Sequence, residues 1–262
     1  MEKKKSKFEY IMYLICRWLV KTFYPRKTLE GTESIPEEPA IYVGNHSQTN
    51  GPIIAQLYMP FRERTWCIGE MMDRKQVPAY AMKDFWPYKN KVERWFLNIF
   101  IHIVAPLCEW IFKNADTIPV YKDSRLITTY RESIKALQDG VSLVIYPEEN
   151  VKYNNIICNF QDKFIDTARL YYKKTGKELL FVPMYLAPRL NKVYYGKPTR
   201  FNSSADINEE RARICKYLMD EITHIAVSLP EHTVVPYLDI RKKDYPRNIP
   251  YVSYLSNEET SC

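Results

Sequence analysis

One histidine, His46, lies in a run of polar and small residues, 44–52, that follows a short apolar stretch. An imidazole ionises near neutral pH, so a histidine in such a loop can act as a general base toward a hydroxyl. Loops after the carboxyl ends of strands in α/β sheets are frequent places for sites of this kind. A histidine in a polar loop is more often a hydrogen-bonded turn residue, so further motifs are needed to support a catalytic role.

Two cations follow a second apolar segment. Lys122 and Arg125 come just after Ile118-Pro119-Val120, at the predicted end of a strand. Ammonium and guanidinium groups in that position can hold a phosphate. The alternative is an exposed, solvated face without a ligand.

A third segment carries carboxylates. The apolar pattern of residues 141–146 runs into Pro147, Glu148 and Glu149. Glu148 is a candidate to orient a base or to bind a hydroxyl, and the alternative is a cap on a following helix. Residues 181–185 place a proline inside a strand pattern, which usually marks an edge or a strand end beside a functional loop.

The elements that must position these groups alternate along the chain. Strand patterns occupy residues 39–44, 65–69, 117–121, 141–146 and 179–186, with one or two more in 192–202. Helix patterns occupy residues 126–138, 160–174 and 207–229. Strands that alternate with helices predict an α/β fold with parallel pairing. We therefore expect a mixed, largely parallel central sheet flanked by helices, with an N-terminal amphipathic helix at the membrane interface.

Residues 1–30 are expected to form that basic amphipathic element. Lys3, Lys4, Lys5 and Lys7 precede an apolar stripe at helical spacing within residues 8–24. The stripe is too short and too charged for a good membrane span. Anionic headgroups attract such a segment to a bilayer surface. Packing of the stripe on the domain core is the equal alternative.

A longer apolar stretch covers residues 95–112. Asn98, His102, Pro106 and Glu109 interrupt it, so it predicts a core helix or a shallowly membrane-embedded helix, kinked or broken near Pro106. A lone histidine on an apolar background is expected to be a packed, hydrogen-bonded core residue. Residues 73–94, rich in charge, proline and aromatics, resemble an insertion over one face.

Composition excludes several classes of function. Hydrophobic residues make up 46% and charged residues 26% of the chain, which is globular composition. The 7 glycines form no dinucleotide-binding or phosphate-binding loop. The 6 cysteines form no metal-binding pattern, so we expect reduced thiols and no metal. The net charge of +7 is concentrated near the chain ends, so nucleic acid is not an expected partner. One domain is expected over residues 31–240, with a tail at 241–262.

In order and kind, the four segments resemble the motif blocks of the glycerol-phosphate and lysophosphatidic acid acyltransferase superfamily. The blocks are Asn45-His46, Ile118-Pro119-Val120, Tyr146-Pro147-Glu148 and Val182-Pro183-Met184, so the resemblance covers roughly residues 35–200. No single block is specific. Four blocks in order, with a helix and a strand between the middle pair, are a stronger signal.

The resemblance implies an O-acyltransferase of phospholipid synthesis. The acyl group would pass from acyl-coenzyme A or acyl-carrier protein to a hydroxyl of a glycerol phosphate or lysophospholipid, with no bound cofactor. His46 would be the base, and Lys122, alone or with Arg125, would hold the acceptor's phosphate. Glu148 would line the acceptor pocket, and the other residues expected to bind substrate are Tyr146, Pro147, Glu149, Asn150 and Lys152. An anionic membrane surface is the expected partner, with the protein peripheral or monotopic at its cytoplasmic face.

The chain departs from the family pattern at one catalytic position. The aspartate that the family carries five positions after the histidine is Gly51 here, and Glu149, Asn150 and Val151 alter the third block. Three explanations compete. Asn50 or Glu148 orients the imidazole, the acceptor is unusual, or catalysis is lost and a membrane-associated lipid-binding protein remains. A large gain in rate in Gly51→Asp would indicate a crippled native site.

Overall fold

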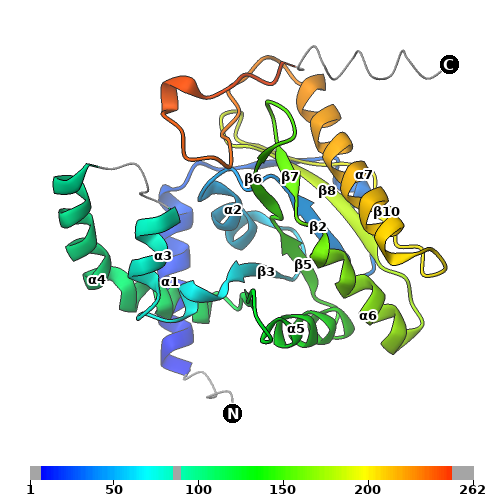
Figure 1. Ribbon diagram of the computed structural model, residues 1–262, viewed down its shortest axis with the longest axis horizontal. Coiled ribbons are helices and arrows are strands. Elements are labelled where there is room, and N and C mark those ends of the chain that lie inside the picture. The colour runs from blue at the N-terminus through cyan, green and yellow to red at the C-terminus, as the bar shows by residue number, and fades with distance from the viewer. Residues whose placement is uncertain (1–6, 85–89, 250–262) are drawn as a thin grey trace. The chain divides into compact units, whose positions relative to one another are not determined.

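The computed structural model describes residues 7–84 and 90–249 (Figure 1). Lys3, Lys4, Lys5 and residues 250–262 of the expected tail lie outside the described part of the chain. Contacts divide the chain into two compact units. Unit 1 comprises residues 1–25 and 64–132, and unit 2 comprises residues 26–63 and 133–262.

Unit 2 is built on a mixed sheet, which confirms the predicted fold class. The pairs β8–β2, β2–β5 and β1–β9 are parallel, and the pairs β8–β9 and β8–β10 are antiparallel. The strands in chain order are β1 (Thr28–Glu30), β2 (Ile41–Gly44), β5 (Ser142–Ile145), β8 (Leu180–Ala187), β9 (Lys192–Tyr195) and β10 (Thr199–Arg200). Strands β2 and β5 are buried at every position, as expected for sheet strands covered on both faces.

The sequence predicted that Pro183 marks an edge strand or a strand end, and both alternatives are wrong, because Pro183 lies inside the central strand β8. Pro183 pairs with Val43 of β2, while β10 and β9 share the other side of β8. β10 pairs with Leu180 and Phe181, and β9 pairs only from Met184 onward. The carbonyl of Pro183 accepts a hydrogen bond from the Gly196 N–H on that side. In any other residue at this position, the N–H would face the gap between β10 and β9. Proline therefore removes no hydrogen bond from the ladder here.

Helices and a hairpin complete unit 2. Helix α7 (Ile207–Ser228) begins at Asp206, whose side chain accepts from the N–H groups of Asn208 and Glu209. It packs along β8 with a buried stripe of Ile214, Leu218, Ile222 and Ala226. The other elements are α2 (Asn50–Tyr58), α6 (Asp166–Thr175), the antiparallel hairpin β6 (Glu148–Lys152) and β7 (Cys158–Phe160), and the short 3-10 helices η1 (Thr32–Ser34), η3 (Asp162–Ile165) and η4 (Lys242–Asp244).

Unit 1 is mainly helical, and its strands β3 and β4 pair in parallel. A small core gathers buried side chains of η2, α3 and α4, including Met71, Val77, Ala81, Ile101 and Ala105. The elements are α1 (Lys7–Phe23), β3 (Glu63–Ile68), η2 (Gly69–Met72), α3 (Val77–Asp84), α4 (Lys91–Asn114), β4 (Ile118–Val120) and α5 (Leu126–Gln138), which continues into unit 2.

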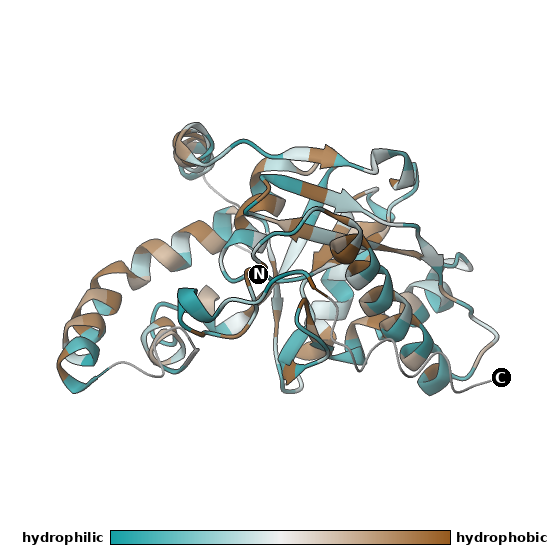
Figure 2. Ribbon diagram, turned by 90° about the horizontal axis from the view of Figure 1, so that it is seen from above, coloured by the Kyte–Doolittle hydropathy of each residue, from teal (hydrophilic) through white to brown (hydrophobic). Residues whose placement is uncertain are grey.

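For helix α4, one alternative of each sequence expectation is wrong. It runs through Pro106 without interruption, so the predicted break is wrong. It is also not a core helix, because most of its large apolar side chains are exposed, among them Phe96 and Ile103. Figure 2 shows hydrophobic residues along most of this helix. By length and composition, α4 is the one helix among the described residues that is long and apolar enough to cross a membrane.

His102 is exposed rather than packed in the core, which corrects that expectation. Its ring is nevertheless hydrogen-bonded, since Nδ1 lies 2.7 Å from the carbonyl oxygen of Asn98, one turn earlier. An exposed polar side chain needs no buried partner, because water can solvate it.

Helix α1 also exposes its apolar residues. Tyr13 is the one buried side chain within α1, and its ring meets the edge of Trp110 on α4. Phe8, Ile11, Trp18 and Phe23 are all more than half exposed. The interpretation that α1 packs its apolar stripe on the core is therefore not supported.

Candidate functional site

The His46 loop and the Glu148 segment meet at the same edge of the unit 2 sheet. Strands β2 and β5 are parallel neighbours with Val43 opposite Ile145. His46 and Glu148 each come three residues after that pair, so the register brings them to the same level. The carboxyl ends of parallel strands are where sites form in α/β sheets. The first and third sequence motifs are thus joined by sheet topology.

The carboxylate of Glu148 binds two backbone N–H groups. Oε1 lies 2.5 Å from the His46 nitrogen, and Oε2 lies 2.8 Å from the Cys158 nitrogen on β7. Glu148 is 3% exposed, and this burial raises its pKa to about 7, against the opposing effect of the two N–H donors. The alternative expectation that Glu148 caps a following helix is wrong, because it opens strand β6. These two hydrogen bonds tie the His46 loop to the β6–β7 hairpin.

The loop that carries His46 is closed by a tight backbone reversal. Ser47 and Gln48 adopt left-handed backbone angles, with φ of 51° and 55°. The carbonyl of His46 accepts from the Gly51 N–H at 3.1 Å, and the carbonyl of Ser47 accepts from Asn50 Nδ2 at 3.0 Å. Strained residues of this kind persist only where the surrounding structure holds them.

Asn45 anchors the start of the loop to the neighbouring strand. Its Nδ2 donates to the Leu186 carbonyl at 3.1 Å, and its Oδ1 accepts from the Leu186 N–H at 2.7 Å. This side chain therefore extends the β2–β8 ladder by one step after β2 ends. The Asn of the Asn-His motif has a positioning role on strand β8.

The imidazole of His46 is half-buried between two tyrosine rings. Its centroid lies 5.4 Å from that of Tyr146 and 5.7 Å from that of Tyr237, both edge-on. Its Nδ1 atom is buried and has no hydrogen-bond partner among the described residues. Burial lowers the His46 pKa to about 4, against the opposing effect of nearby backbone groups of Gln48 and of His46 itself. The ring is therefore neutral at pH 7, the form that a general base requires.

Neither Asn50 nor Glu148 forms a hydrogen bond with Nδ1 of the His46 ring. Glu148 binds the backbone of His46, and the Asn50 amide donates to the Ser47 carbonyl. These contacts do not support the interpretation that Asn50 or Glu148 holds the imidazole tautomer. They support a role for both residues in holding the loop.

Gly51 leaves no room for a side chain in this arrangement. A Cβ atom there would lie 2.4 Å from the His46 carbonyl oxygen and 3.1 Å from two ring atoms of Tyr146. The Tyr146 hydroxyl donates to the Gly51 carbonyl at 2.8 Å, which fixes the ring in that space. The position of the expected aspartate is thus closed both by backbone and by an aromatic ring.

Residues from beyond the sheet also reach the His46 loop, and sequence reasoning missed them. The Val235 carbonyl accepts from the Ser47 hydroxyl at 3.3 Å, and Tyr245 shares hydrogen bonds with the Gln48 amide. Tyr237 contributes the second ring against His46. The segment after residue 230 has no periodicity, and its richness in tyrosine was the available signal.

The expected phosphate-binding cations lie in unit 1. Lys122 and Arg125 are exposed. The Arg125 guanidinium pairs with Asp123 at 2.7 Å and stacks on the Tyr121 ring at 4.0 Å. Hydrogen bonds from Arg125 lower the Asp123 pKa to about 2, so this pair is charged at neutral pH. A phosphate at Arg125 would have to compete with Asp123, and the role of both cations stays a prediction.

The remaining candidates surround Glu148 on unit 2. Pro147 is buried, and its carbonyl accepts from the Gln161 N–H at 2.9 Å. Glu149 is half-buried, whereas Asn150 and Lys152 are exposed on β6. No group of three or more potential metal ligands occurs within residues 7–84 and 90–249.

Comparisons with known proteins include a distant structural likeness. No protein-family model matches the sequence, and a search of curated proteins gives no match. Among solved structures, the chain is similar to the 1-acyl-sn-glycerophosphate (LPA) acyltransferase PlsC from Thermotoga maritima. The identity is 16%, the match covers 82% of this chain and 79% of that chain, and the TM-score is 0.45. A likeness at this level carries no information on the site.

Proposed function

We propose that this protein transfers an acyl group from a thioester, acyl-coenzyme A or acyl-carrier protein, to a hydroxyl of a glycerol phosphate or lysophospholipid. The observation that carries the proposal is the bond from the His46 N–H to the Glu148 carboxylate. It joins the first and third motifs at the carboxyl ends of neighbouring strands. The motif resemblance depends on sequence alone, whereas this contact requires the two segments to meet in space.

In the proposed reaction, His46 takes the proton of the acceptor hydroxyl through Nε2. The hydroxyl oxygen attacks the thioester carbonyl carbon, a C–O bond forms, and the C–S bond breaks. The imidazolium then returns its proton to the departing thiolate. Nδ1 lacks a hydrogen-bond partner among the described residues, so no carboxylate there stabilises the imidazolium. We therefore expect a slower enzyme than one with an Asp–His pair.

The second candidate is a membrane-associated lipid-binding protein that has lost catalysis. The observation in its favour is the closed space at Gly51, where backbone and the Tyr146 ring occupy the place of a side chain. A carboxylate at position 51 would fit only if the backbone and the Tyr146 ring moved. Fold and loop geometry are compatible with either candidate.

The reaction is proposed to take place at a membrane, at the cytoplasmic face, with the protein peripheral or monotopic. Support comes from unit 1, where α1 and α4 both expose large apolar side chains such as Phe23 and Ile103. Exposed apolar surface on this scale commonly marks an interaction site. Both an acyl chain and the lipid product would partition into that bilayer.

Acyl transfer with purified full-length protein in vesicles tests the proposal. Radiolabelled acyl-coenzyme A and acyl-carrier protein are offered against glycerol phosphate and a panel of lysophospholipids. We expect a product with wild type, a loss of at least about a hundredfold in His46→Ala, and no loss in His224→Ala. His224 is an exposed histidine on α7 of the same unit and serves as the matched control.

The outcomes separate the two candidates. Product from wild type that is retained in a folded His46→Ala protein would refute the assigned base. Absence of product with every donor and acceptor, from protein that still binds vesicles, would establish the lipid-binding alternative. Circular dichroism of each variant shows whether the fold is intact.

A further inference from the structure

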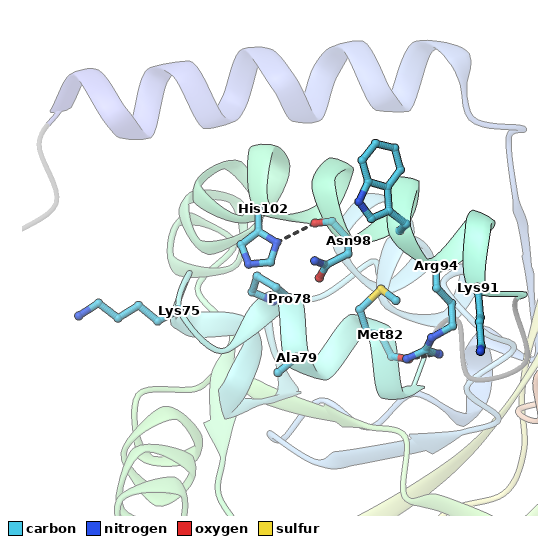
Figure 3. A pocket seen from close by; sticks show the side chains of 9 residues that line it. Lys75, Pro78, Ala79, Met82, Lys91, Arg94, Asn98 and His102 are labelled. Atoms are coloured by element: carbon cyan, nitrogen blue, oxygen red, sulfur yellow. Dashed lines mark hydrogen bonds between the residues drawn. The ribbon is translucent and has the colours of Figure 1, made fainter.

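A groove with a volume of about 520 Å³ lies in unit 1 between α3 and α4. Figure 3 shows Pro78, Ala79 and Met82 of α3 on one side, with Arg94 and His102 of α4 on the other. The groove belongs entirely to unit 1 and includes neither His46 nor Glu148. It therefore shares no lining residue with the site described above.

The lining of this groove is cationic. Lys75, Lys91 and Arg94 line it, and no acidic residue does so among the described residues. Lys75 and Lys91 are exposed, whereas Arg94 is half-buried and donates to the Met82 carbonyl at 3.4 Å. Three basic side chains around one hollow attract an anion, and guanidinium and ammonium groups are the usual phosphate ligands.

Polar side chains of α4 follow a single line along the groove. Lys91, Arg94, Asn98 and His102 are spaced by three or four residues, so they share one face of the helix (Figure 3). The ring of His102 is held by its Nδ1 bond to the Asn98 carbonyl, 2.7 Å away. A polar line of this length argues against a helix that crosses a bilayer.

An apolar line runs beside the polar one. Val92, Phe96, Ile99, Ile103 and Leu107 recur at intervals of three or four residues, and each is at least 43% exposed. A third face of α4 packs on the core of unit 1 through Ile101 and Ala105. The helix therefore presents apolar side chains to the outside and cations at their border.

Trp95 stands at that border. It lines the groove and is 60% exposed, next to Phe96, which its ring meets edge-on with centroids 4.8 Å apart. An indole with one apolar side and one polar group is typical of the boundary between acyl chains and headgroups. The order along this surface, from apolar side chains through an indole to cations, matches the layers of an anionic bilayer.

We propose that this groove binds the phosphodiester headgroup of an anionic phospholipid while the apolar line of α4 lies among the acyl chains. The occupant is a lipid of the bilayer rather than free phosphate, because the apolar line has no role with a soluble anion. The inference rests on the proposed membrane association of unit 1, and not on acyl transfer by His46.

The test measures partition of full-length protein onto vesicles of pure phosphatidylglycerol and of pure phosphatidylcholine. The test variant Lys75→Gln/Lys91→Gln removes two exposed charges that line the groove. The matched control Arg74→Gln/Lys83→Gln removes two exposed charges of the same unit that do not line it. Both variants have the same net charge, so long-range attraction changes equally.

We expect the test variant to lose at least about tenfold in partition onto phosphatidylglycerol, with a much smaller loss in the control. Tryptophan emission should shift to the blue on binding, and Trp95→Phe should remove part of that shift. Excess inorganic phosphate should not displace the protein from vesicles.

Four results would overturn the proposal. Equal losses in the test and control variants would show general electrostatic attraction without a site. Equal partition of wild type onto both lipids would leave membrane association intact and refute a headgroup site. Failure to bind either vesicle would refute the membrane association itself. Retention on DNA in place of vesicles would assign the cations to another partner.

Discussion

At the residue scale, the site is defined by where the polar atoms of His46 and Glu148 point. The carboxylate of Glu148 holds backbone N–H groups of His46 and Cys158, and the imidazole lies between Tyr146 and Tyr237. The hydrogen bonds of Glu148 hold the loop, and the tyrosine rings hold the imidazole in place. None of these contacts fixes which ring nitrogen carries the proton. Nδ1 is buried and has no hydrogen-bond partner among the described residues, so no side chain there selects the tautomer of the imidazole.

Gly51→Asp is expected to damage the protein rather than to restore a missing catalytic group. The new Cβ would collide with the His46 carbonyl oxygen and press on the Tyr146 ring. We expect a loss of about 1–3 kcal/mol in the free energy of unfolding, with no gain in acyl transfer. Denaturant unfolding and the transfer assay measure the two effects.

Gly140→Asn is the control for that substitution. Gly140 has φ of 75°, a Cβ added there would meet no heavy atom within 4 Å, and asparagine tolerates left-handed backbone. A stable Gly51→Asp protein with raised activity would contradict the geometry at Gly51.

At the element scale, α4 decides how unit 1 meets its surroundings. The same helix packs Ile101 on the unit 1 core and exposes Phe96 and Ile103. The sequence has apolar residues on most faces of this helix, which is typical of a buried helix as well as a membrane helix. Only the packing of η2 and α3 against one face shows which residues remain outside.

Serine substitutions on α4 distinguish its two apolar faces. Phe96→Ser/Ile103→Ser is expected to leave the free energy of unfolding within about 0.5 kcal/mol of wild type, because both side chains are exposed. The same variant should bind vesicles more weakly. Ile101→Ser, at a position that is 4% exposed, should instead cost about 2–5 kcal/mol. Unfolding curves that rank the two variants in the opposite order would refute the assignment of faces.

At the scale of the whole molecule, two groups of unit 2 whose pKa values are shifted by burial contribute to the pH dependence of stability between about pH 4 and 7. The folded-state pKa of His46 is about 4, below its usual 6.5, and that of Glu148 is about 7, above its usual 4.5. From about pH 4 to 6.5 the unfolded chain binds more protons at the histidine, so this group makes stability rise with pH. From about pH 4.5 to 7 the folded chain binds more protons at the carboxyl, so that group makes stability fall.

In the pH range where both groups titrate, the histidine raises stability with pH and the carboxyl lowers it. A variant that lacks one group should therefore show the pH dependence of the other group alone. We expect the free energy of unfolding of His46→Gln to fall as the pH rises from about 5 to 7, because Glu148 remains. We expect that of Glu148→Gln to rise as the pH rises from about 5 to 6.5, because His46 remains. Each change should be on the order of 1–3 kcal/mol. Urea unfolding at several pH values measures the slopes relative to wild type. Identical pH profiles for both variants would show that these groups do not titrate with the shifted pKa values.

Much of the local structure was predictable from the sequence because it depends on local patterns. The helix at residues 126–138 was predicted at its observed bounds, and the strands around 41–44 and 142–145 were recognised as apolar runs. Hydrophobic periodicity and stop signals such as Gly176, with its left-handed backbone, act over a few residues and need no knowledge of the fold. His46 and Glu148 were likewise identified by residue type and order.

The sequence by itself determined the class of fold, the strands and helices with clear periodicity and the candidate residues for chemistry, since propensity and side-chain chemistry are local properties. Tertiary structure alone decided that Glu148 binds the loop backbone, that Tyr146 closes the space at Gly51, and that Tyr237 lies against the imidazole. It also decided which faces of α4 are covered. These outcomes depend on strand register and on contacts between distant segments, and no short-range pattern records either of them.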